Sequence, residues 1–155
     1  MRALALLLAV ATPAAAQEAQ MHHATGTFQV TITTEAQAPA PAGGMPTARM
    51  AIAKTFGGDL VATAIGTMLS AGVPQPGHAA AYVAIDQING TLAGRSGGFL
   101  LLHQGTMSQA GSVLTVVIAP GSGTGGLTGI AGSLSIEVRD GVHHYDLAYS
   151  LPASH

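Results

Sequence analysis

Apolar and polar residues alternate along most of the chain. In the segment 25–34, Phe28, Val30 and Ile32 share one face, while threonine and glutamine side chains take the other. A period of two residues predicts a β-strand with one buried face. The same pattern predicts seven further strands, over 48–56, 59–70, 79–92, 97–107, 111–120, 133–138 and 142–151. No segment predicts a helix.

Turn signals separate these segments, and the links are short enough for antiparallel neighbours. We interpret Asn89-Gly90 and Asp140-Gly141 as hairpin turns, the former in preference to a glycosylation site. The proline-rich segments 35–46 and 71–78 are expected to be loops. Eight antiparallel strands in one small domain predict an all-β fold, a closed barrel whose interior holds side chains or one small ligand. A two-sheet β-sandwich is the alternative.

The chain begins with a typical export signal. Arg2 precedes an apolar stretch over 3–11, and Ala14-x-Ala16 follows as a cleavage site, which predicts a signal peptide over 1–16 and a periplasmic or secreted protein. The apolar stretch is shorter than the ~20 residues that span a bilayer. The polar segment 17–24 is expected to be a flexible arm, and 25–155 a single domain.

Composition narrows the class of partner. The chain has no cysteine, so disulfides and thiolate metal ligands are excluded. Five Lys and Arg residues stand against seven Asp and Glu, with no basic cluster, which argues against nucleic acid and anionic membranes as partners. Sparse charge combined with many apolar residues is typical of buried strands. The partner that fits this composition is a small apolar or aromatic molecule.

One glycine-rich segment resembles a cofactor loop. The sequence "PGSGTGGLTGIAG" contains Gly121-x-Gly123-x-x-Gly126, the spacing of a dinucleotide-binding turn. Such a turn needs a following helix to hold the pyrophosphate, whereas "SLSIEV" alternates and predicts a strand. The segments 92–101 and 127–136 also share Leu-x-Gly-x-x-Gly-x-(Phe or Leu)-x-(Leu or Ile). We therefore interpret these glycines as tight turns, and we predict no cofactor.

Three polar residues on otherwise apolar strand faces are candidate catalytic residues. Asp86 shares a face with Tyr82, and His103 lies on the Phe99 and Leu101 face of the next strand. If both faces point inward, the carboxylate can orient the imidazole as a general base, with Tyr82 as acid or hydrogen-bond donor. The alternative is a structural pair, or side chains that point outward into a subunit contact.

Three further residues are candidate ligand-binding residues. Arg95 lies in the turn of the first glycine repeat, where it could bind an anionic ligand at the barrel rim. Tyr145 and Tyr149 share one strand face and could reach the interior. The alternatives are an exposed turn arginine and tyrosines that pack in the core with locally satisfied hydroxyls.

The two histidine pairs do not predict a metal site. His22-His23 and His143-His144 are adjacent residues, and adjacent side chains on a strand point to opposite faces. Neither pair can chelate a metal through both rings, and no third ligand has suitable spacing.

Three segments resemble those of a known protein family, and the resemblance covers nearly the whole chain after the predicted signal peptide. They are "AYVAIDQINGTLAGRSGGFLLLHQGTM", "PGSGTGGLTGIAG" and "HHYDLAYSLP". They resemble the bacterial domain of unknown function 3224 family. The resemblance implies an allene oxide cyclase-like barrel of eight antiparallel strands that forms a homodimer or another homo-oligomer. Relatives with this barrel act on apolar or phenolic small molecules, but the resemblance implies no catalytic residues.

Three functions are compatible with these observations. The first is an exported barrel that binds a small apolar or aromatic molecule. The second is a cofactor-independent isomerase or cyclase that uses Asp86, His103 and Tyr82. The third is a structural or interaction module with a filled interior, and the absence of a ligand-sized cavity would exclude the first two.

Overall fold

The computed structural model describes residues 20–73 and 78–152. These residues form strands and connecting turns, with no helix and hence none that could cross a membrane. The strands are β1 (His22–Ala38), β2 (Thr47–Gly58), β3 (Leu60–Gly72), β4 (Ala80–Leu92), β5 (Arg95–Ser108), β6 (Gly111–Ile118), β7 (Thr124–Gly125), β8 (Ala131–Arg139) and β9 (Val142–Ser150).

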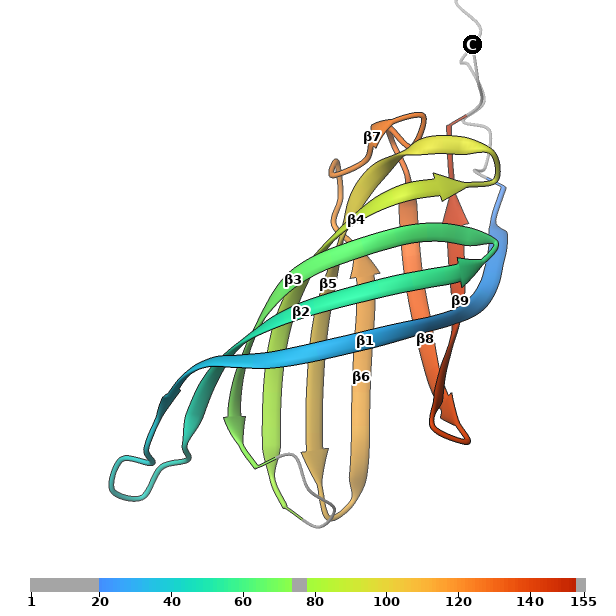
Figure 1. Cartoon of the computed structure of the whole chain (residues 1–155). Coiled ribbons are helices and arrows are strands. Elements are labelled where there is room, and N and C mark those ends of the chain that lie inside the picture. Colours follow the sequence, from blue (N-terminus) through green and yellow to red (C-terminus); the bar gives the residue numbers. More distant parts are fainter. Residues whose placement is uncertain (1–19, 74–77, 153–155) are drawn as a thin grey trace, which may run out of the picture.

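Eight of these strands close into an antiparallel barrel (Figure 1). The order around the ring is β4-β3-β2-β1-β9-β8-β6-β5, and pairing between β5 and β4 closes it. The two-residue strand β7 is an addition that pairs with β5 at Gly97 and Gly98. The predicted eight-stranded barrel is therefore confirmed, and the sandwich is not formed.

The first strand is longer than the alternation predicts. It begins at His22, inside the segment expected to be an arm, because the residues from His22 to Phe28 pair with β9. Pairing with β2 begins only at Gly26. It runs on to Ala38 through a bulge between Thr34 and Ala36, so the loop before β2 is shorter than predicted. The predicted signal peptide lies outside the described residues.

The turn predicted at Asn89-Gly90 is wrong. Both residues lie within β4, opposite Gly98 and Gly97 of β5, and the chain reverses at Ala93-Gly94 instead. Those two residues have φ angles of 50° and 75°, the left-handed region that a tight turn needs. Gly90 is required for another reason, since a Cβ there would overlap the carbonyl oxygen of Val61 on β3.

The glycine-rich segment over 120–132 is a turn, as predicted, and leads into strand β8. It is held by short backbone hydrogen bonds, among them Leu127 N–H to the Thr124 carbonyl at 3.0 Å and Ile130 N–H to the Leu127 carbonyl at 3.1 Å. Leu127 and Ile130 are buried members of the hydrophobic core, and the segment lies at the end of the barrel where β7 is seen (Figure 1).

One half of the barrel is filled by a hydrophobic core. It lies toward the end of the glycine-rich turn, where Leu60, Leu92 and Leu101 are completely buried. The other buried members are Ala24, Phe28, Phe56, Ala62, Ala64, Ile88, Phe99, Val116, Ile118, Leu127, Ile130, Leu134, Tyr145, Leu147 and Tyr149. This core stabilises the barrel from one half, so the opposite half of the interior can hold a cavity.

Candidate functional site

The half of the barrel away from this core holds a cavity of about 540 Å³ that is partly open to solvent. Its wall is mainly apolar and includes three methionines, Met50, Met68 and Met107, together with the small residues Gly72 and Ala84. The remaining lining residues are Phe28, Val30, Ile32, Ile52, Lys54, Ser70, Ala80, Ala81, Tyr82, His103, Leu114, Ile136, Val138 and His143. This volume lies in the range of small-molecule sites.

Three charged or titratable side chains meet at the boundary between the cavity and the core. Lys54 of β2, Asp86 of β4 and His103 of β5 all occupy inward-facing positions of their strands, with exposed fractions of 8%, 0% and 6%. Nζ of Lys54 donates to Oδ2 of Asp86 at 2.6 Å. Nε2 of His103 lies 3.0 Å from the same oxygen. We call these residues the buried polar cluster.

A glycine makes room for this cluster. Strand β3 lies between β2 and β4, and Gly66 of β3 is the register partner of Asp86. A Cβ at Gly66 would overlap Oδ1 of Asp86 and approach the Ile85 carbonyl oxygen. The carboxylate therefore lies over the glycine, and from there it reaches Lys54 on the far side of β3.

The electrostatics of the cluster keep Asp86 ionised. Burial alone would raise the pKa of Asp86, but the neighbouring His103 and the charge of Lys54 outweigh it and hold the pKa below its usual value. The polar atoms are not all paired within the described residues: Oδ1 of Asp86 and Nε2 of His103 make no hydrogen bond. The contact between Asp86 and His103 has ion-pair distance but lacks hydrogen-bond orientation.

Two aromatic side chains, Phe28 and Tyr82, line the cavity together with Lys54 and His103. Nζ of Lys54 lies 5.3 Å from the ring centroid of Phe28, within reach of a cation–π interaction. Tyr82 packs over Gly105, where a Cβ would overlap its ring. Burial and the charge of Asp86 raise the pKa of Tyr82, so its phenol stays protonated and can donate a hydrogen bond.

Comparison with known proteins identifies the family. The family model described as "Protein of unknown function (DUF3224)" matches residues 24–149. The chain belongs to the DUF3224 family. The match covers every strand that lines the cavity, including the three that carry the buried polar cluster.

A solved structure from the same family shares the fold. The crystal structure of a protein with unknown function from the DUF3224 family of Shewanella oneidensis superposes with a TM-score of 0.78. It is 40% identical in sequence, and the match covers 86% of the present chain and 100% of that one. No curated protein matches the chain.

The DUF3224 barrel brings together the three residues predicted as catalytic. Asp86 and His103 face inward and lie in contact, and Tyr82 lines the same cavity. Sequence reasoning missed Lys54, which completes the cluster. One signal pointed to it, because Lys54 is the only charged residue in an alternating run with Met50, Ile52 and Phe56.

The three residues predicted to bind a ligand lie elsewhere in the DUF3224 barrel. The hydroxyl of Tyr145 accepts from the Leu60 N–H at 2.9 Å and donates to the Gly57 carbonyl at 3.2 Å. Tyr149 is buried in the core, and Arg95 begins β5 at the core end of the barrel. None of the three lines the cavity, and the two tyrosines match the alternative of core packing.

The histidine pairs are separated by their strands. Nδ1 of His23 lies 2.8 Å from Oδ1 of Asp146 on the surface, and the ring of His143 lies 4.9 Å from that of Phe28. Among residues 20–73 and 78–152, no group of three His, Cys, Asp or Glu side chains is placed to hold a metal ion.

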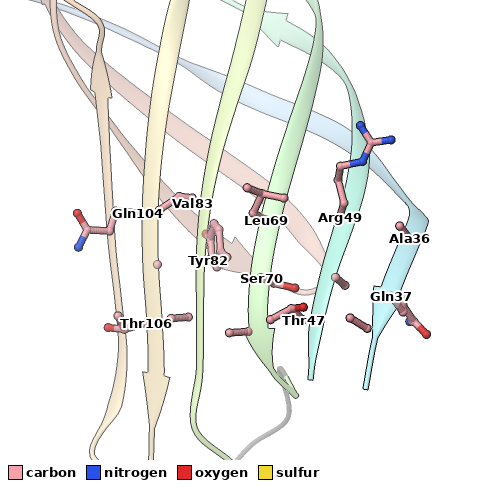
Figure 2. A pocket seen from close by; sticks show the side chains of 15 residues that line it. Ala36, Gln37, Thr47, Arg49, Leu69, Ser70, Tyr82, Val83, Gln104 and Thr106 are labelled. Carbon is pink, nitrogen blue, oxygen red and sulfur yellow. The ribbon is translucent and has the colours of Figure 1, made fainter. Parts of the chain in front are cut away.

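A second hollow, of about 650 Å³, lies on the outer face of the barrel. Figure 2 shows this groove, with Leu69 and Val83 between Arg49 on one side and Gln104 on the other. Arg49 pairs with Glu35 at 3.4 Å, and neither Asp86 nor His103 lines the groove. The interior cavity is therefore the candidate site, because the buried polar cluster lies there.

The outer face of β3 to β6 is apolar. Between Leu60 and Ile118 the sequence has only two Asp, Glu, Lys or Arg residues, the buried Asp86 and Arg95. Its large exposed apolar residues are Val61, Ile65, Leu69, Val83, Ile85, Val113 and Val117. Such a surface is typical of protein contacts, and self-association stays a prediction.

Proposed function

We propose that the interior cavity binds a small, largely apolar or aromatic molecule. The observation that carries this proposal is the 540 Å³ cavity in the half of the barrel that the core leaves open. The wall of the cavity is mainly apolar, so an apolar molecule that enters it removes its own surface and that of the wall from water. The predicted leader peptide would place the binding outside the cytoplasm.

The lining supports a bound molecule with a defined orientation. Apolar walls supply most of the contact area, while a few side chains, among them Tyr82, Lys54 and His103, supply polar groups. Binding sites for small molecules commonly combine these two features. The three methionines have flexible, polarisable side chains that can adapt to the shape of the ligand.

Filling the cavity is expected to abolish binding. Ala84 is buried and lines the cavity beside its register partner His103, so Ala84→Leu places three more carbon atoms where the ligand would lie. The natural chain, purified from its native compartment and extracted, should yield a small apolar molecule by mass spectrometry. The Ala84→Leu chain should yield less than about a tenth as much, since a clash costs at least ~1.4 kcal/mol.

Ala53→Leu is the matched control. Ala53 is an exposed alanine on β2, beside Lys54 but on the outer face. This variant should carry the natural amount of ligand. Equal ligand content in the Ala84→Leu and Ala53→Leu chains would contradict the proposal, as would a natural chain that never carries ligand.

The contact between Asp86 and His103 favours one second function, a cofactor-independent isomerase or cyclase. A buried carboxylate 3.0 Å from an imidazole can orient the ring and stabilise its protonated form. His103 lines the cavity and would take a proton from the bound molecule, while Tyr82 would return one to another atom. Such an isomerisation needs no cofactor, because the substrate loses one proton and gains one proton and is neither oxidised nor reduced.

The molecule extracted from the natural chain can be used to test whether the barrel converts its ligand or only binds it. Incubated with fresh protein, it should be converted to an isomer of the same mass, detected by NMR, if the barrel is an enzyme. His103→Ala is expected to slow this conversion by about 10²–10⁴-fold, the usual contribution of a general base. Binding without any isomer, even after long incubation, would leave the barrel as a binding protein alone.

A further inference from the structure

We infer that the ligand of this cavity carries one carboxylate group at the end of an otherwise apolar body. The inference rests on the proposed function and adds the chemical class of the ligand. The carboxylate lies at the inner end, against Lys54 and His103. The apolar body extends toward Met107 and Leu114, near the turn between β5 and β6.

The first support is hydrogen-bonding capacity that the protein leaves unused. The Lys54 ammonium has three donor protons, and in the described chain one of them is given to Asp86 while the group faces the Phe28 ring. His103 is more than nine-tenths buried, and its Nε2 lies 3.0 Å from Oδ2 of Asp86 but lacks the orientation of a hydrogen bond to it. Buried polar groups normally have partners. A ligand that accepts hydrogen bonds supplies them.

The second support is the balance of charge around the cavity. Lys54, His103 and His143 line it, whereas none of its described lining residues is acidic. Asp86 lies behind the wall, fully buried, and neutralises Lys54. Within the buried polar cluster, two basic side chains, Lys54 and His103, face one carboxylate, that of Asp86. Tyr82 is a further titratable group of the cavity wall. The charged and titratable side chains that face a ligand here therefore offer hydrogen-bond donors and no negative charge.

The same balance disfavours other head groups. An amine would bring a second cation next to Lys54 with no acidic lining residue to offset it. An alcohol could accept a hydrogen bond but would lack the charge that strengthens it. Among molecules with one apolar body, the cavity should therefore prefer the acid to the alcohol, and the alcohol to the amine.

Three probes of equal chain length test this order. Decanoic acid, 1-decanol and decylamine are titrated into the full chain, freed of bound ligand, at pH 7, and dissociation constants are measured by calorimetry. Decanoate is expected to bind at least about tenfold more tightly than decanol, since hydrogen bonds to charged groups are stronger than neutral ones. Decylamine is expected to bind most weakly.

Two variants locate the preference at the buried polar cluster. Lys54→Met combined with Asp86→Leu removes both charges together, so that neither is left buried alone. Decanol should still bind this double variant, but the tenfold preference for the acid should disappear. His103→Gln keeps the ion pair and should reduce the preference several-fold, which preserves the test if the double variant does not fold. The control, Glu35→Leu with Arg49→Met, removes the outer ion pair and should leave the preference unchanged.

The outcomes separate the two proposals. Equal binding of decanoate and decanol, tightest binding of decylamine, or a preference that survives the variants of the cluster would each overturn the inference and leave the binding function standing. If none of the three probes binds the natural chain, both the inference and the binding function are wrong.

Discussion

Replacement of Asp86 by alanine is expected to lower the free energy of unfolding by about 3–5 kcal/mol, the largest effect of any single substitution in the buried polar cluster. The carboxylate is fully buried and accepts from the Lys54 ammonium at 2.6 Å. Without it, Lys54 remains nine-tenths buried with no acidic partner among the cavity-lining residues. The loss of stability arises because the Lys54 ammonium stays buried without a carboxylate, and not because the alanine side chain is smaller than that of aspartate.

A double variant tests that physical cause. In Lys54→Met with Asp86→Leu, both charges are replaced by apolar side chains, and replacement of a whole buried pair is often neutral or stabilising. We expect urea unfolding to show most of the loss recovered, so that the double variant is more stable than Asp86→Ala alone. A double variant as unstable as the single one would show that the cost has another origin.

Asp146→Ala is the matched control for the loss of a carboxylate. Asp146 also pairs with a basic side chain, His23 at 2.8 Å, but both groups are well exposed. Exposed pairs contribute little, so the expected loss is below about 1 kcal/mol. A loss for Asp146→Ala as large as that for Asp86→Ala would contradict the role assigned to burial.

The barrel and two of the three residues of the buried polar cluster can be predicted from local patterns in the sequence. Alternation predicts which residues of a strand share a face, and it placed Asp86 with Tyr82 and His103 with Phe99 and Leu101. The structure shows that both of these faces point inward. Asp86 and His103 also lie on strands joined by one hairpin, in which His103 is opposite Ala84, two residues from Asp86. Neighbouring positions of one hairpin can be inferred without knowledge of the rest of the sheet.

Lys54 could not be placed in the same way, because its contact crosses a strand. It lies on β2, Asp86 lies on β4, and the two meet over Gly66 of β3. That contact depends on the register of two strand pairs and on a missing side chain in the middle strand. A one-residue error in either register would have turned Lys54 or Asp86 outward.

The mistaken turn at Asn89-Gly90 has a similar cause. The dipeptide favours a two-residue turn locally, but two further residues of β4, Thr91 and Leu92, pair with β3 before the chain reverses. The close approach of Val61 explains the glycine, and this approach is a property of the neighbouring strand. The hydroxyl partners of Tyr145, which are backbone groups of Gly57 and Leu60, were hidden for the same reason.

Gly66→Ala is expected to destabilise the barrel by about 2–3 kcal/mol, in the upper range for an over-packed interior. A methyl group there overlaps Oδ1 of Asp86 and presses on the Ile85 carbonyl oxygen. The carboxylate must therefore move, and its short contact with Lys54 is strained or lost. The free energy of unfolding, measured by urea titration, gives the size of the effect.

Gly57→Ala is the matched control, and a second background shows where the cost of Gly66→Ala arises. Gly57 also lies in a strand, but a Cβ there meets nothing within 4 Å, so its replacement should change stability by less than about 0.5 kcal/mol.

In the Asp86→Ala background the overlap with Oδ1 is gone, and the backbone contacts with the Ile85 carbonyl oxygen and with Cα of residue 86 remain. The cost of Gly66→Ala should then fall by about 1 kcal/mol or more, the coupling expected of residues in contact. An unchanged cost in that background would mean that Gly66 is required by the backbone of β4 alone and not by the carboxylate over it.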